Sequence, residues 1–143
     1  MRAIIAAAGT GGHINPGLAI ANKIMEKEKD SSIIFIGTNR GLETDLVPRS
    51  GYSLKTINAH GLERKITIQN IKNLFETYKS IKEAKEIIKE FNPDILIGTG
   101  GYICVPTVIA AKKLGIPVIL HESNAFPGIA VKLFKNKADK ILV

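Results

Sequence analysis

The sequence contains one cysteine, no tryptophan and no long apolar run, and each absence excludes a class of protein. Cys104 has no second cysteine with which to form an internal disulfide, which is typical of a reducing compartment. No apolar stretch approaches the ~18 residues that a membrane-spanning helix requires. The first residues also lack the apolar segment of a secretory signal peptide. We therefore expect a cytoplasmic protein without a membrane span.

The chain carries a formal net charge of +7, which favours an anionic partner. Nucleic acid, a phosphate-bearing substrate and an anionic membrane surface would each satisfy this charge. Proteins that stack nucleic-acid bases need aromatic residues among the basic ones, and here there are only five Phe and three Tyr. This scarcity weakens the first option, and we expect no nucleic-acid partner.

Short apolar runs rich in β-branched residues alternate with helical patterns along the 143 residues. The runs are hydrophobic throughout, which is typical of parallel strands covered by helices on both faces. Strands are expected at residues 2–8, 32–37, 52–57, 94–98, 117–121 and 140–143. Helices are expected at residues 16–28, 41–47, 68–91, 105–114 and 127–136. The alternation predicts one α/β domain over residues 1–143, with a doubly wound, Rossmann-like, mostly parallel sheet.

Two similar glycine turns, GTGGHINPG at 9–17 and GTGGYICVP at 98–106, each lie between an expected strand and an expected helix. Pro16 and Pro106 stand where each helix should begin, because the first helical turn tolerates proline. Glycine lets the backbone approach a ligand, and a helix start offers free N–H groups to an anion. The turns predict a phosphate site at the carboxyl edge of the sheet. The alternative is that these glycines only permit tight turns.

Neither turn matches a familiar cofactor motif. The dinucleotide fingerprint G-x-G-x-x-G fails because Ile14 and Ile103 occupy the third glycine position. A phosphate-binding P-loop fails because Leu18 stands where lysine is required. The stretch GTNRGLE after the second expected strand has no acid at its tip to hold a ribose, which disfavours a nicotinamide cofactor. No Asp-x-Asp pair or H-E-x-x-H is present, so we expect no cofactor and no metal.

Three stretches in order, GTGGHINPGLAIA, GTGGYICVP and HESNAFPG, resemble the N-terminal half of the bacterial MurG glycosyltransferase family. The resemblance extends over essentially all 143 residues. It implies a GT-B enzyme with an acceptor-binding N-terminal domain and a nucleotide-sugar-binding C-terminal domain that this chain does not include. The implied reaction moves N-acetylglucosamine from UDP-GlcNAc to undecaprenyl-diphospho-muramyl-pentapeptide, which converts lipid I to lipid II in peptidoglycan synthesis. The implied location is peripheral, on the cytoplasmic face of the cell membrane.

The resemblance also implies roles for individual residues. His13 is the expected general base, and a free imidazole pKa of about 6.5 suits a base that works near neutrality. Expected contacts to UDP-GlcNAc come from Thr10, Gly11, Gly12 and Asn124. Expected contacts to the acceptor come from Gly100, Gly101, Tyr102, His121 and Glu122. No metal is implied, because helix starts and backbone amides can stabilise the leaving UDP.

Structural alternatives stay open for several of these residues. His13 could instead cap the following helix, and His121 is more typical of a structural residue at the end of an apolar strand. His60 is expected in a solvated loop, and Cys104 is not expected to act in catalysis. The sequence departs from the family at Ser123, where glutamine is frequent, and at Val105, where a smaller residue is frequent. Val105 could narrow the approach to the second glycine turn.

Residues 62–82 combine apolar and basic side chains. Between 64 and 82 one acid, Glu76, accompanies five basic residues, namely Arg64, Lys65, Lys72, Lys79 and Lys82. Apolar residues at helical spacing are expected to face the sheet, namely Ile68, Ile71, Phe75, Tyr78, Ile81, Ile88 and Phe91. Leu62, Ile66 and Leu74 fall outside that stripe. The segment predicts docking on an anionic membrane surface, and an ordinary solvated helix is the alternative.

Two further functions remain compatible with the sequence. One is a subunit of a split N-acetylglucosaminyltransferase that acts on another polyprenyl diphosphate. The other is a phosphate-binding module without catalytic activity. The resemblance places most nucleotide contacts in the domain that this chain does not include, so we expect the 143-residue fragment alone to be inactive.

Overall fold

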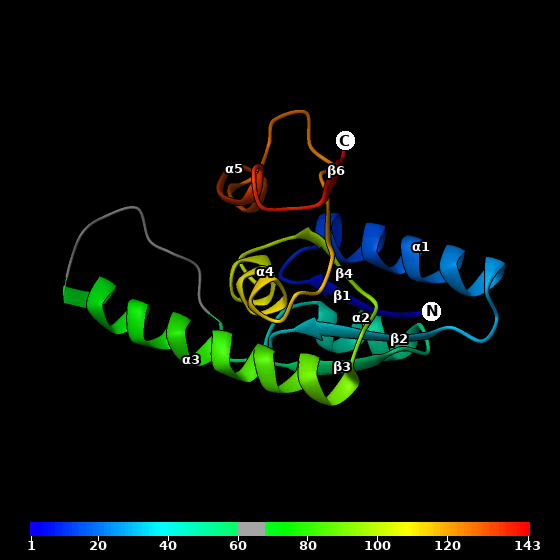
Figure 1. Ribbon diagram of the computed structural model, residues 1–143, viewed down its shortest axis with the longest axis horizontal. Helices are drawn as coiled ribbons and strands as arrows, with labels where there is room; N and C mark the ends of the chain where they lie inside the picture. The colour runs from blue at the N-terminus through cyan, green and yellow to red at the C-terminus, as the bar shows by residue number, and fades with distance from the viewer. Residues whose placement is uncertain (60–67) are drawn as a thin grey trace.

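The computed structural model describes residues 1–59 and 68–143, with side chains omitted at 68–75 and 129. Its described residues form one six-stranded sheet in the order β3-β2-β1-β4-β5-β6, and every neighbouring pair is parallel (Figure 1). The strands are β1 (Arg2–Ala7), β2 (Ser32–Gly37), β3 (Ser53–Thr56), β4 (Ile95–Gly100), β5 (Val118–His121) and β6 (Lys140–Leu142). This topology confirms the predicted doubly wound fold.

Helices cover both faces of the sheet. They are α1 (Gly11–Lys27), α2 (Glu43–Arg49), α3 (Ile68–Phe91), α4 (Cys104–Lys113) and α5 (Ile129–Phe134). Buried residues of α1 and α2 pack on one face, and those of α3, α4 and α5 pack on the other. The first turns of α3 project beyond the edge of the sheet (Figure 1).

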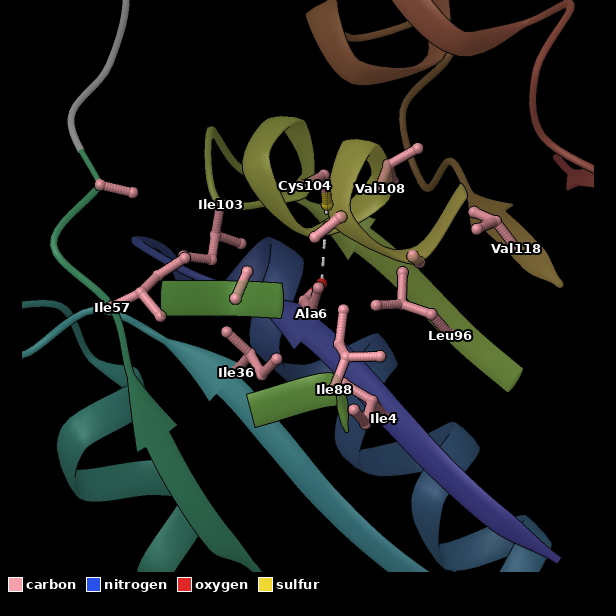
Figure 2. Close-up of a cluster of buried hydrophobic side chains, with 14 of the residues drawn as sticks. Ile4, Ala6, Ile36, Ile57, Ile88, Leu96, Ile103, Cys104, Val108 and Val118 are labelled. Atoms are coloured by element: carbon pink, nitrogen blue, oxygen red, sulfur yellow. Dashed lines mark hydrogen bonds between the residues drawn. The ribbon is translucent and has the colours of Figure 1, made fainter. Parts of the chain in front are cut away.

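Side chains of β1 alternate between two hydrophobic cores. Ile5 belongs to the core beneath α1 and α2, which also contains Phe35. Ile4 belongs to the other core, where Ile88 of α3 and Val108 of α4 pack against the sheet (Figure 2). Because both faces of the strand are buried, the strand sequence is apolar at every position and shows no polar alternation.

The start of α1 differs from the prediction. The helix begins at Gly11, five residues before the predicted start, so Pro16 is its sixth residue. Two glycines are poor helix formers, and the prediction was wrong because tertiary contacts outweigh that local preference. Proline has no N–H to donate to the Gly12 carbonyl oxygen, and Ser123 Oγ donates to that oxygen at 3.3 Å instead. Pro106 does lie in the first turn of α4, as predicted.

The buried face of α3 also differs from the predicted apolar stripe. Tyr78 was expected to face the sheet, but 69% of its surface is exposed. Between residues 76 and 91, the fully buried positions of α3 are Ser80, Ala84 and Ile88, which are spaced four residues apart. Small side chains let α3 pack closely along α4, and a search for large apolar residues does not detect such a face. Ile81 and Phe91 pack at its edge, whereas the side chains of Ile68, Ile71 and Phe75 lie outside the described set.

Replacing Ile88 with alanine is expected to lower the free energy of unfolding by about 2–5 kcal/mol, because the change leaves a cavity in a dry core. Tyr78→Ala on the solvent side of the same helix should change it by less than about 0.5 kcal/mol. Urea unfolding followed by circular dichroism measures both values. Equal losses in the two variants would show that Tyr78 is packed as the apolar pattern predicted.

Candidate active site

The two glycine turns meet at the centre of the sheet. β1 and β4 are adjacent strands, and the chain winds away from them in opposite directions, through β2 on one side and β5 on the other. One glycine turn follows each of these strands. Their carboxyl ends therefore form the topological switch point, where open α/β sheets bind ligands. This confirms the predicted equivalent positions of the two turns at one edge of the sheet.

The second glycine turn packs directly against the first. Gly100 and Gly101 adopt φ angles of +127° and +84°, which side-chain-bearing residues rarely adopt. A Cβ atom on Gly100 would overlap the imidazole of His13. One on Gly101 would lie 2.5 Å from the backbone oxygen of Ala8. Glycine is required at both positions because any side chain there would clash with the first glycine turn. The sequence interpretation did not include this reason.

His13 lies in the first turn of α1 with its side chain half-buried. Its Nδ1 atom is 3.1 Å from the backbone oxygen of Ala8. A carbonyl oxygen can only accept, so this hydrogen bond places a hydrogen on Nδ1 and leaves the lone pair of Nε2 available. The imidazole thus bonds a carbonyl and does not cap the helix, whose N-cap residue is Thr10. The hydroxyl of Thr99 fixes the backbone by donating to the His13 oxygen at 2.7 Å.

A cavity of about 380 Å³ lies beside this histidine. Most of the predicted site residues line it, namely His13, Gly100, Gly101, Tyr102, His121, Glu122 and Asn124. The cavity lining does not include Thr10, Gly11 or Gly12, which lie at the N-terminal end of α1. Gly11 and Gly12 belong to the first helical turn, where backbone N–H groups have no partner within the helix. The structure therefore separates the predicted acceptor residues from most of the predicted donor residues.

Glu122 shapes the segment that follows β5. One carboxylate oxygen accepts hydrogen bonds from the backbone and side-chain nitrogens of Asn124, at 3.0 and 2.8 Å. The other accepts from the backbone N–H of Gly128. Burial alone would raise the pKa of Glu122, but these hydrogen bonds and the charge of His13 outweigh it and hold the pKa below its ordinary value. Glu122 thereby holds Asn124 at the rim of the cavity.

His121 is not a fully satisfied core residue. Its side chain lines the cavity, and its Nδ1 atom is buried without a hydrogen-bond partner among the described residues. A buried nitrogen of this kind costs free energy unless it meets a polar group. The arrangement therefore leaves this nitrogen available to a polar group in the cavity, either of a ligand or of a water molecule.

A family model described as the glycosyltransferase family 28 N-terminal domain matches residues 3–143. The chain belongs to this family. It is 50% identical over its whole length to an enzyme of Desulforamulus reducens named UDP-N-acetylglucosamine--N-acetylmuramyl-(pentapeptide) pyrophosphoryl-undecaprenol N-acetylglucosamine transferase. An enzyme of the same name from Thermoanaerobacter is 44% identical. The chain spans 38% and 44% of the lengths of these relatives.

Solved structures agree with this assignment. A crystal structure of MurG from Acinetobacter baumannii superimposes with a TM-score of 0.84 at 29% identity, covering 98% of this chain and 40% of that one. The calicheamicin glycosyltransferase CalG4 has a TM-score of 0.59 at 16% identity, over 95% of this chain and 37% of that one, and so shares the fold alone. The sequence resemblance to MurG is thus confirmed.

The family 28 domain contains a buried carboxylate that the sequence interpretation missed. Glu43 is fully buried, and its Oε2 atom accepts from the Gly9 N–H at 2.9 Å. Its Oε1 atom accepts from the backbone N–H and the hydroxyl of Thr38, at 2.9 and 2.7 Å. Burial raises the pKa of Glu43, and these hydrogen bonds more than offset that effect, so the pKa lies below its ordinary value. The available signal was an acid two residues after Gly41, in the segment that follows the second strand.

Two further findings concern the cysteine and the potential metal ligands. Cys104 is fully buried, with Sγ 3.4 Å from the Gly100 oxygen and 3.6 Å from the Ala6 oxygen (Figure 2). Burial raises the pKa of this thiol to about 12, so it is not a nucleophile at neutral pH. Among the described residues, no three His, Cys, Asp or Glu side chains lie together as potential metal ligands.

Adding a methyl group at Gly101 is expected to displace the two glycine turns. Gly101→Ala combines an unfavourable positive φ with a backbone clash at Ala8, so the free energy of unfolding should fall by about 2–5 kcal/mol. Gly115 is the matched control, because its φ is +74° but no atom lies within 4 Å of the added Cβ. Gly115→Ala should cost only about 1–2 kcal/mol. Similar urea midpoints for the two variants would contradict the packing of the turns.

Glu43 should make stability depend on pH in the acid range. Because its pKa is lower in the folded state, its stabilisation is complete above the ordinary value near 4.5 and is lost as the pH falls through the lower, folded value. Glu43→Gln should lower the free energy of unfolding by about 1–3 kcal/mol at neutral pH. The reason is that the amide NH₂ group would replace an oxygen that accepts from the N–H of Gly9 or Thr38, so that two donors would face each other. The substitution should also flatten the decline in stability below pH ~4.5.

Asp45 provides the control, since it lies on the same helix with its side chain exposed and paired with Arg49. Asp45→Asn should change the free energy of unfolding by less than about 1 kcal/mol. Denaturant titrations at a series of pH values give both profiles. An unchanged acid slope in Glu43→Gln would show that the carboxylate does not titrate as its hydrogen bonds imply.

Proposed function

We propose that this domain is the acceptor-binding half of an inverting N-acetylglucosaminyltransferase. The donor is UDP-GlcNAc, and the acceptor is undecaprenyl-diphospho-muramyl-pentapeptide, so the product is lipid II for peptidoglycan synthesis. The names of the relatives support this substrate pair. The observation that carries the proposal is His13, whose Nδ1 hydrogen bond leaves Nε2 free beside the cavity at the switch point.

In the proposed reaction, Nε2 of His13 removes the proton from the attacking sugar hydroxyl. The hydroxyl oxygen forms a bond to the anomeric carbon of N-acetylglucosamine, and the bond from that carbon to the diphosphate oxygen breaks. The electron pair of the broken bond leaves with UDP. Attack from the face opposite the leaving group inverts the anomeric configuration. The proton remains on His13 until solvent removes it.

The negative charge of the leaving UDP requires stabilisation, and the described residues that line the cavity include no lysine or arginine. The free N–H groups of Gly11 and Gly12, at the positive end of α1, are suited to this task, with Thr10 beside them. Asn124 is the remaining proposed contact to UDP-GlcNAc. Its side-chain amide donates one hydrogen to Glu122, so its second hydrogen and its oxygen can bond the donor sugar. We place the remaining nucleotide contacts in the part of the enzyme that follows this domain, as the greater length of the relatives supports.

The acceptor occupies the other side of His13 in this proposal. Gly100, Gly101 and Tyr102 form one wall, and His121 offers its unpaired ring nitrogen. Glu122 contributes by holding the rim, since its oxygens already accept three hydrogen bonds from the protein.

The enzyme would act at the membrane surface. Within the described residues no helix is long and apolar enough to cross a bilayer. On α3, Tyr78, Lys79 and Lys82 are exposed and suit peripheral contact with an anionic, cytoplasmic leaflet. Most of the predicted basic and apolar segment, including Leu62, Arg64, Lys65 and Ile66, lies outside the described residues, as does His60.

His13→Asn separates catalysis from structure. The asparagine amide can still donate to the Ala8 oxygen, but it cannot accept a proton. In the complete transferase, kcat should fall about 10²–10⁴-fold, with the same thermal midpoint as wild type. His13→Ala should lose activity to the same extent. A radiolabelled sugar-transfer assay measures both, and wild-type turnover in His13→Asn would overturn the proposed base.

A further inference from the structure

The residues that line the cavity beside His13 are of two chemical kinds. Polar groups come from the glycine turns and the residues after β5, and we call this part of the lining the polar end. Apolar side chains come from two helices, Val105 and Pro106 of α4 and Ala130 and Val131 of α5, and we call this part the apolar end. In Figure 1, α4 lies between α3 and α5. The proposed sugar transfer uses only the polar end, so the apolar end requires another explanation.

Among the described side chains of α3 that line the cavity, neither Thr77 nor Ser80 is an unpaired polar group. The Ser80 hydroxyl lies 2.6 Å from the Asn58 oxygen and 2.7 Å from the Glu76 oxygen. No lysine or arginine is among the described residues that line the cavity. A volume of about 380 Å³ lies within the range of roughly 300–1,000 Å³ that is typical of small-molecule sites. The cavity therefore has room for a branched hydrocarbon group beside a polar head.

The α3 wall connects this end to the outer surface of the domain. Thr77 and Ser80 line the cavity, while Tyr78, Lys79 and Lys82 on the same turns are exposed. A chain that left the cavity along α3 would meet the surface that we propose to face the membrane. The domain thus combines polar lining, apolar lining and, on the outer side of the α3 wall, exposed cations, which suit the head, the tail and the membrane of an anionic amphiphile.

We infer that the apolar end binds the first isoprene units of the acceptor lipid, next to its diphosphate. The inference rests on the proposed function and adds a site for the hydrocarbon. Val105 lines the cavity and follows the second glycine turn in the sequence, so it joins the polar lining to the apolar lining. Each buried methylene favours binding by about fourfold, so a buried isoprene unit should strengthen binding by at least about tenfold after its ordering is counted.

The experiment measures binding of inorganic diphosphate and of dimethylallyl, geranyl and farnesyl diphosphate to the complete protein by calorimetry. For wild type, affinity should rise by about tenfold or more with the first isoprene units and then level off when the cavity is full. Ala130→Phe and Val105→Phe fill the apolar end from two different helices, α5 and α4. In both variants the ratio of farnesyl diphosphate affinity to diphosphate affinity should fall by at least about tenfold.

Leu133→Phe is the matched control, because Leu133 lies on the same helix as Ala130 but is 52% exposed and outside the cavity. Its affinity ratio should equal that of wild type. Equal binding of diphosphate and farnesyl diphosphate by wild type would overturn the inference, as would an equal loss in Leu133→Phe. Sugar transfer assayed in parallel separates the two proposals, since an active enzyme without chain-length dependence retains the proposed function and loses only the lipid site.

Discussion

The close packing of one glycine turn on the other is the constraint on which the site depends. Gly101 lies against the Ala8 backbone, and Gly100 lies against the His13 ring. The same Ala8 oxygen accepts the hydrogen bond from Nδ1 of His13. One carbonyl therefore limits the position of the second turn and determines that Nδ1 of the imidazole carries a hydrogen. Neither turn could change its backbone without moving the histidine.

Two carboxylates hold the segments around this contact. Glu43 ties the first glycine turn to the end of β2, and Glu122 closes the segment after β5. Each accepts several N–H bonds in a site with little or no solvent contact, and such bonds stabilise the charged form enough to outweigh burial. The carboxylates of Glu43 and Glu122 thus serve mainly to fix the backbone of these segments. The fixed backbone in turn positions the polar groups of the site.

The parts of the fold that were predictable are those in which local and tertiary preferences agree. Apolar runs gave β2 at Ser32–Gly37, and helical spacing gave α3 at Ile68–Phe91, both with the predicted bounds. The start of α1 and the buried face of α3 were wrong, because close packing there selects glycine, serine and alanine, whose weak hydrophobicity leaves little pattern. The burial of Glu43 depends on partners in β2 and the first turn, which the spacing of its own neighbours does not reveal.

The position of the positive charge distinguishes recognition of a diphosphate from attraction to an anionic membrane. The net charge of the sequence alone does not distinguish them. The chain has a net charge of +7, yet the described lining of the cavity includes neither lysine nor arginine. Helix-end amides can recognise a diphosphate at short range, where geometry decides. Surface cations act over a Debye length of about 8 Å in physiological salt, and there they attract a whole anionic surface. In the proposed enzyme, lysines would therefore bring the domain to the membrane, whereas amides and one imidazole would act on the substrate. Because the two sets of groups are distinct, membrane binding can be tight without holding the product's diphosphate in the site.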